Sequence, residues 1–119
     1  RRICSSCAEP YQPSSFEREW YARIECLVRS PDEAPKTEFV RGRGCNFCGG
    51  SGFHDRVGVY ELLRVNDEIR EMIITKATPQ VVREAAIRNG MRSMAQQAAA
   101  LVAADATTID EVLRNVYVG

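Results

Sequence analysis

Two Cys-x-x-Cys pairs, Cys4/Cys7 and Cys45/Cys48, are the residues of this chain best suited to chemistry. Two residues between cysteines allow one tight turn to direct both sulfurs at the same ion, and a second such turn completes four ligands. The pattern therefore predicts a tetrahedral thiolate site for zinc. Disulfide bonds are the alternative, but Cys26 makes the number of cysteines odd, and the Cys-x-x-Cys spacing is typical of a reducing compartment.

The predicted zinc site is structural, because four protein sulfurs leave no coordination position for water or substrate. Zinc with four thiolates carries two formal negative charges, which backbone amides and nearby cations must offset. Arginines flank both pairs and are candidates for this role: Arg1, Arg2, Arg41 and Arg43. Five glycines crowd the second pair, as expected where the backbone turns tightly around a metal: Gly42, Gly44, Gly49, Gly50 and Gly52.

No catalytic residue is expected in this chain. The sequence contains no phosphate-binding loop, no nucleophile-elbow motif and no His-Glu-x-x-His motif. The single histidine, His54, has no cysteine or carboxylate partner at a spacing typical of catalysis, so we expect an exposed loop residue.

The composition bounds the class of protein. The chain has 119 residues, with 16 basic and 16 acidic side chains, so nothing at the level of net charge indicates nucleic acid or an anionic membrane. No apolar run approaches the length of a membrane span, which predicts a soluble chain without direct membrane insertion. Because it starts at Arg1 and reaches a ligand by residue 4, we expect a fragment of a larger protein.

Residues 1–63 are expected to form the tetracysteine subdomain. A helix inside the 37-residue interval between the pairs is predicted from a hydroxyl cap at Ser14 and a stripe of apolar residues: Phe16, Trp20, Ile24 and Leu27. Cys26, next to that stripe, is expected in the core. Short strands are predicted at 37–41 and 57–63.

Residues 64–119 are expected to form a small bundle of about four helices. Asn66 and Thr78-Pro79 mark the starts of the first two, and Asn89-Gly90 marks an exit. A third helix is predicted at 92–105 and a fourth from Thr108, where a second capping box occurs. The predicted fold class is therefore α+β, mainly α.

The run from Gly42 to Leu63, GRGCNFCGGSGFHDRVGVYELL, resembles the C-terminal region of the assembly ATPases of type II secretion and type IV pilus systems, the GspE/PilB family. The opening RRICSSC and three stretches of the tail, at 67–73, 86–94 and 107–114, are also similar to that family. The sequence departs from the family pattern at Ser51, Phe53, Asp55 and Gln97-Ala98. Asp55 replaces a glycine that marks a special backbone conformation, so the loop after the second pair is expected to differ locally.

The resemblance implies that the parent protein is a cytoplasmic hexameric ATPase that docks on an inner-membrane platform protein. ATP and magnesium would bind upstream of this chain. The four cysteines would form the structural clasp of a stiff projection that contacts a neighbouring subunit of the homohexamer or the platform. Two alternatives are a nucleic-acid-binding zinc ribbon and a DnaJ-like zinc adaptor. The Cys-x-x-Cys-x-Gly-x-Gly repeat of the latter matches at Cys45 but not at Cys4, and one match in two argues against it.

Overall fold

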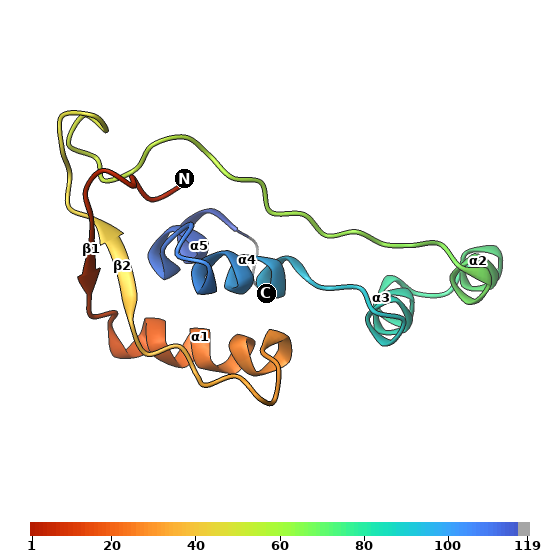
Figure 1. Ribbon diagram of the computed structural model, residues 1–119. Coiled ribbons are helices and arrows are strands. Elements are labelled where there is room, and N and C mark those ends of the chain that lie inside the picture. The colour runs from red at the N-terminus through yellow and green to blue at the C-terminus, as the bar shows by residue number, and fades with distance from the viewer. Residues whose placement is uncertain (117–119) are drawn as a thin grey trace. The chain divides into compact units, whose positions relative to one another are not determined.

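The computed structural model describes residues 1–116, which form two strands and five helices, confirming the mainly α, α+β class. The elements are β1 (Ala8–Tyr11), α1 (Ser15–Val28), β2 (Phe39–Gly42), α2 (Asp67–Ile74), α3 (Pro79–Arg88), α4 (Met94–Ala103) and α5 (Ile109–Asn115), shown in Figure 1. None of the helices in residues 1–116 combines the length and the hydropathy needed to span a bilayer.

The chain divides into two compact units. The first contains residues 1–59 and, from 94 onward, α4 and α5, whereas the second contains residues 60–93. The tetracysteine segment and the last two helices therefore belong to one unit although 34 residues lie between them. The expected domain boundary between residues 63 and 64 stays a prediction, and the last three residues of that expected domain, 117–119, lie outside the described part.

The first unit is built on α1, which packs against α4 and α5. Ser14 caps α1 by accepting a hydrogen bond from the Glu17 amide, as its sequence predicts. Tyr21 on α1 meets Phe39 on β2 edge to face, with ring centroids 5.2 Å apart. The buried residues of this core are Trp20, Tyr21, Phe39, Ala95, Ala98, Ala99, Val102, Ile109 and Val112. Alanine on α4 allows the helices to approach closely, because its side chain is a single methyl group.

The inward face of α1 differs from the predicted stripe. Trp20 is buried and Ile24 partly buried, but Phe16 and Leu27 are 66% and 63% exposed. Cys26 is also exposed, so its predicted place in the core is wrong. The buried face of α1 is shifted by one residue from the predicted stripe, so that Tyr21 and Glu25 are buried.

The strand β2 follows the predicted segment closely, but its partner was not anticipated. β1 pairs with β2 antiparallel, from Ala8 opposite Gly42 to Tyr11 opposite Phe39. The strand predicted at 57–63 is wrong, since that segment is extended without strand pairing.

The second unit is an α2–α3 hairpin. Asn66 and Thr78 cap these helices by accepting hydrogen bonds from the amides of Ile69 and Val81, as predicted. Its buried residues are Ile69, Ala85 and Ala86, with Met72, Val82 and Met91 packed around them. Outside the core, Glu68 accepts hydrogen bonds from the side chains of Arg88 and Asn89.

Candidate metal centre

Backbone hydrogen bonds join the first cysteine pair to the loop that follows the second pair. The Cys4 amide donates to the Gly52 carbonyl at 2.9 Å, and Ile3 forms an isolated antiparallel bridge with Phe53. The turn closes with a longer bond from the Cys7 amide to the Cys4 carbonyl, 3.4 Å. β1 begins at the next residue, so both Cys4 and Cys7 are buried beside the sheet.

The second pair leaves the end of β2 in a glycine-rich turn. The Gly50 amide donates to the Cys45 carbonyl at 2.9 Å, which folds residues 45–50 back on themselves. Gly44, Gly49, Gly50 and Gly52 all have positive φ, as predicted from their density. Cys45 and Cys48 are half-buried, so this side of the centre is the more accessible one.

The close approach of two backbone segments brings the pairs together. A Cβ added at Gly42 would lie 1.9 Å from the Gly52 carbonyl oxygen, and one added at Gly52 would lie 2.4 Å from the Gly42 oxygen. Gly42 is the last residue of β2 and pairs with Ala8, next to Cys7. These two glycines therefore allow the strand pair and the second turn to approach closely enough for the four sulfurs to meet.

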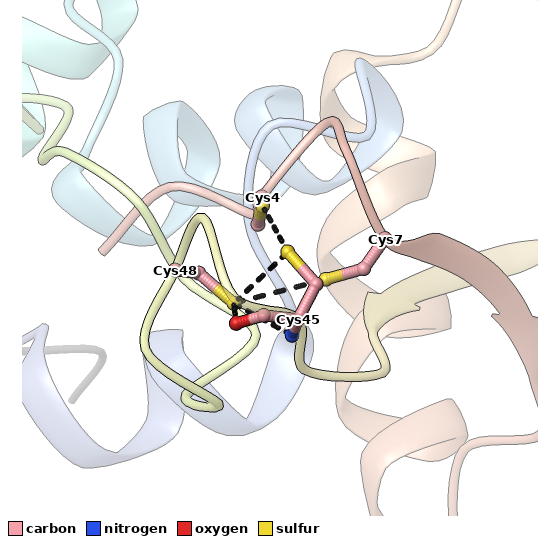
Figure 2. A group of neighbouring side chains, drawn as sticks. All are labelled: Cys4, Cys7, Cys45 and Cys48. Atoms are coloured by element: carbon pink, nitrogen blue, oxygen red, sulfur yellow. Dashed lines mark hydrogen bonds between the residues drawn. The ribbon is translucent and has the colours of Figure 1, made fainter.

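The four sulfur atoms face one another, as Figure 2 shows. Cys4 and Cys45 Sγ are 3.8 Å apart, Cys45 and Cys48 are 3.7 Å apart, and Cys7 and Cys48 are 3.9 Å apart. All four lie within 4.8 Å of one another. A zinc–sulfur distance of about 2.3 Å gives a regular tetrahedron with edges of about 3.8 Å. The cysteines are free and too far apart for disulfide bonds, which need about 2.05 Å.

Backbone amides point at the sulfurs on the side of the second pair. Cys48 Sγ accepts from the amides of Cys45 and Gly52, both at 3.2 Å, and Cys7 Sγ accepts from Gly44 at 3.3 Å. Desolvation by burial raises the pKa of the Cys7 thiol. Burial acts in the same direction on Cys48, but its two amide donors and neighbouring thiols outweigh it and lower its pKa. The donor set fits a tetrahedral four-sulfur metal site, which is typical of zinc or iron.

Two of the four arginines near the cysteines, Arg1 and Arg41, contact carboxylates. Arg1 binds Glu111 on α5, and Arg41 lies 3.8 Å from Glu9 and faces the Tyr11 ring. Their guanidinium groups thus engage carboxylates rather than sulfur. The hydrogen bonds to the sulfurs come from main-chain amides and from neighbouring thiols.

His54 is exposed, as predicted, with its ring 4.3 Å from that of Phe47. Phe47 is 61% exposed at the tip of the second turn. Asp55 has a φ of 67°, in the left-handed region that favours glycine, so the aspartate adopts a special backbone conformation at the position where the family has glycine. The Asp55 carbonyl accepts from the Arg2 amide at 3.0 Å, which explains why this conformation is held.

Comparison with known proteins identifies the class. The family described as Type II/IV secretion system protein matches residues 1–114, and the chain belongs to this family. It is 31% identical to the type IV pilus assembly ATPase PilB of Thermus thermophilus over 95% of this chain. It is also 31% identical to the type II secretion system protein E of Pseudomonas aeruginosa over 96% of this chain, and 30% identical to PilB of Myxococcus xanthus over 97%.

The chain spans only 12%, 21% and 19% of the lengths of these three relatives. The family match over residues 1–114 and these relatives confirm the resemblance to the GspE/PilB family over nearly the whole chain. The activity that the relatives' names state belongs to much longer proteins.

Proposed function

We propose that Cys4, Cys7, Cys45 and Cys48 bind one zinc ion whose role is structural. The observation that carries this proposal is the gathering of the four sulfurs within 4.8 Å of one another, with three of the six separations at 3.7–3.9 Å, the edge length expected of a zinc–thiolate tetrahedron. Zinc bound here would complete its four ligands with protein sulfur, cross-link the two turns and neutralise part of the thiolate charge. Four protein ligands leave no open position for a reacting molecule.

Elemental analysis of freshly reduced protein tests the site, and we expect about one zinc per chain. The Cys45→Ser variant should lose the metal, because three thiolates bind zinc far more weakly than four. Cys26→Ser is the matched control, since Cys26 is exposed and its thiol donates to the Arg23 carbonyl. Protein without metal, or equal zinc in both variants, would refute the assignment.

We infer that the chain is the non-catalytic C-terminal portion of a hexameric ATPase that powers type IV pilus assembly or type II secretion. Membership of the secretion family and the names of the relatives support this role. ATP and magnesium would bind in the part of the parent protein that precedes Arg1. The coding sequence upstream tests this directly: a phosphate-binding loop is expected within a few hundred residues, and its absence would end the ATPase assignment.

In this proposal the zinc-containing unit is a stiff projection that contacts a neighbouring subunit or the inner-membrane platform protein, on the cytoplasmic side. Phe47 is the exposed aromatic residue at the tip of the metal-binding turn and is the natural place for a probe. A photo-crosslinking amino acid at position 47 of the full-length protein should give products with one of these two partners. The same probe at Gln80, on the second unit, is the matched control. Equal yields at both positions, or none at 47, would contradict the projection model.

A further inference from the structure

The segment that precedes the first cysteine pair is clamped on two sides. On one side, the Arg2 amide donates to the Asp55 carbonyl at 3.0 Å and the His54 amide donates to the Arg2 carbonyl at 2.9 Å. On the other, the Ile3 amide donates to the Ala106 carbonyl at 2.9 Å, and the Thr107 hydroxyl donates to the Arg1 carbonyl at 2.8 Å. The backbone leading to Cys4 is therefore fixed by the loop after the second pair and by the turn before α5.

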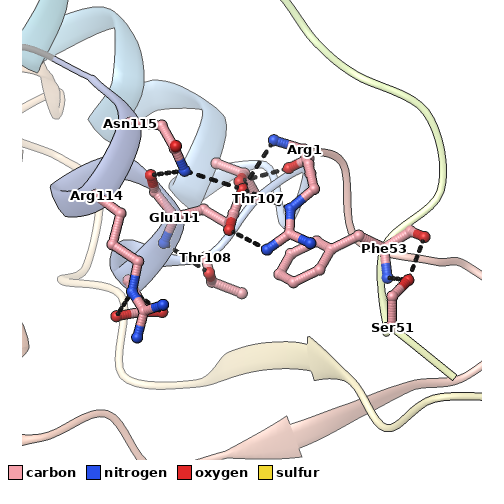
Figure 3. Close-up of polar contacts among 9 residues, drawn as sticks. Arg1, Ser51, Phe53, Thr107, Thr108, Glu111, Arg114 and Asn115 are labelled. Carbon is pink, nitrogen blue, oxygen red and sulfur yellow. Dashed lines mark hydrogen bonds and ion pairs between the residues drawn. The ribbon is translucent and has the colours of Figure 1, made fainter.

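Glu111 on α5 completes this arrangement, as Figure 3 shows. The Arg1 guanidinium donates to both carboxylate oxygens, from Nη2 to Oε1 at 2.6 Å and from Nε to Oε2 at 3.2 Å. The Glu111 side chain is 3% exposed, whereas that of Arg1 is 50% exposed. The Arg1 guanidinium also lies 4.3 Å from the centre of the Phe53 ring, which belongs to the bridge with Ile3.

The sequence around Glu111 indicates a simpler role that the structure does not bear out. The capping-box pattern at Thr108 predicts that Glu111 turns back to the start of its own helix. The Thr108 hydroxyl does accept from the Glu111 amide at 3.1 Å. The carboxylate instead accepts from Arg1 and from the Asn115 amide group at 3.3 Å. The carboxylate of a residue in a capping-box position therefore binds Arg1, three residues before Cys4.

A buried carboxylate in this position is sensitive to the loss of its partner. Removing one member of a buried ion pair leaves an uncompensated charge or an unsatisfied donor, which costs more than the pair contributes. The two parallel hydrogen bonds of the Arg1–Glu111 pair also fix the orientation of the guanidinium, which a single contact would not. Glu111 therefore adds a side-chain restraint on Arg1 to the main-chain hydrogen bonds that hold residues 1–3 and, through them, the Cys4 turn.

We propose that Glu111 is a positioning residue for the metal centre: through Arg1 it holds the Cys4 turn in the place where its sulfur meets those of Cys45 and Cys48. This inference rests on the proposed zinc site. It makes α5 part of the metal-binding machinery, although α5 supplies no ligand and lies more than 60 residues after the last cysteine.

The rate of zinc release tests the proposal. Zinc-loaded full-length protein is mixed with an excess of the chromogenic chelator 4-(2-pyridylazo)resorcinol, and release is followed by absorbance. Glu111→Gln keeps the shape of the side chain but removes the charge, and we expect release about tenfold faster, the scale seen when groups that orient metal ligands are lost. Asp110→Asn is the control: it makes the same change on the neighbouring residue, whose carboxylate is exposed and bound to Arg114.

A second control separates positioning from general stability. Lys36→Ala removes the ion pair with Asp105, which also lies in the first unit. It should lower the unfolding temperature without changing the rate of zinc release, whereas Glu111→Gln should change both. Equal rates for wild type and Glu111→Gln, or equal acceleration by Lys36→Ala, would overturn the inference.

Arg1→Lys decides the matter if Glu111→Gln fails to fold. Lysine keeps the positive charge but cannot donate in a fork, and the Arg1 side chain is half-exposed, so the fold tolerates the change. Zinc release should be faster than in wild type and slower than in Arg1→Ala. A wild-type rate in both Arg1 variants would refute the positioning role. Wild-type protein without zinc would refute the proposed function itself, so the two failures are distinguishable.

Discussion

Replacing Gly42 with alanine is the sharpest test of how the two halves of the metal centre meet. The added Cβ would lie 1.9 Å from the Gly52 carbonyl oxygen and 2.5 Å from its carbonyl carbon, and both are backbone atoms that no rotamer change can move. The Gly52 carbonyl also accepts the hydrogen bond from the Cys4 amide. Relief of the clash therefore requires the second turn to move away from the first.

The expected cost has two parts. Forcing a methyl group into a closely packed contact costs about 1–3 kcal/mol, and loss of the Cys4 hydrogen bond adds about 1 kcal/mol. We therefore expect the free energy of unfolding of the zinc-loaded chain to fall by about 2–4 kcal/mol, measured by urea denaturation.

Gly50→Ala is the matched control, because the two glycines are needed for different reasons. At Gly50 nothing lies within 4 Å of the added Cβ, but φ is +82°. Only the left-handed backbone is then penalised, at about 1–2 kcal/mol. If Gly42→Ala cost less than Gly50→Ala, or less than about 0.5 kcal/mol, the close approach of residues 42 and 52 would be refuted.

Three further predictions follow from other parts of the molecule. Chelation of zinc should increase hydrogen exchange in residues 1–59 and also in α4 and α5, while α2 and α3 keep their protection, because α1 packs on α4 and α5; exchange confined to residues 1–63 would contradict this. The hydrogen bond from Asn89, together with Arg88, holds the pKa of Glu68 below its usual 4.5, so the contribution of Glu68 is present above that pH and is lost as the pH falls through the lowered value. Thermal unfolding of Glu68→Gln should show a smaller loss of stability on acidification, and an unchanged pH profile would refute the contact. Asp55→Gly should raise the free energy of unfolding by up to about 1 kcal/mol in urea, since glycine adopts a φ of 67° without strain, and a lower stability would show that the aspartate side chain outweighs the strain.

The helix starts and the two cysteine turns could be predicted from the sequence because each depends on a few neighbouring residues. Ser14 and Thr78 cap their helices through amides three residues on, and each cysteine pair is defined by one turn. Such local signals do not depend on what the rest of the chain does.

The predictions that were wrong or missing concern elements whose packing partners lie far away in the sequence. Helical periodicity placed Phe16 and Leu27 inward, but the buried face of α1 is chosen by α4 and α5, more than 60 residues later. β1 contains Pro10 and only four residues, so it becomes a strand through β2 rather than by propensity. The segment 57–63 has the apolar character of a strand and no strand partner within residues 1–116. The capping-box pattern already accounts for a glutamate at position 111, so nothing in the sequence indicated that Glu111 contacts Arg1.

The distance in sequence between Arg1 and Glu111 has a consequence for synthesis. The four cysteines are complete once residue 48 has been made, but Glu111 follows Arg1 by 110 positions. At about 5–20 residues per second, the ribosome needs roughly 3 to 13 s to add residues 49–111, which separate the last cysteine pair from Glu111. The nascent chain therefore has the four cysteines of the proposed zinc site before it has the helix proposed to position the first turn, and we expect zinc captured early to exchange more readily than zinc in the finished molecule.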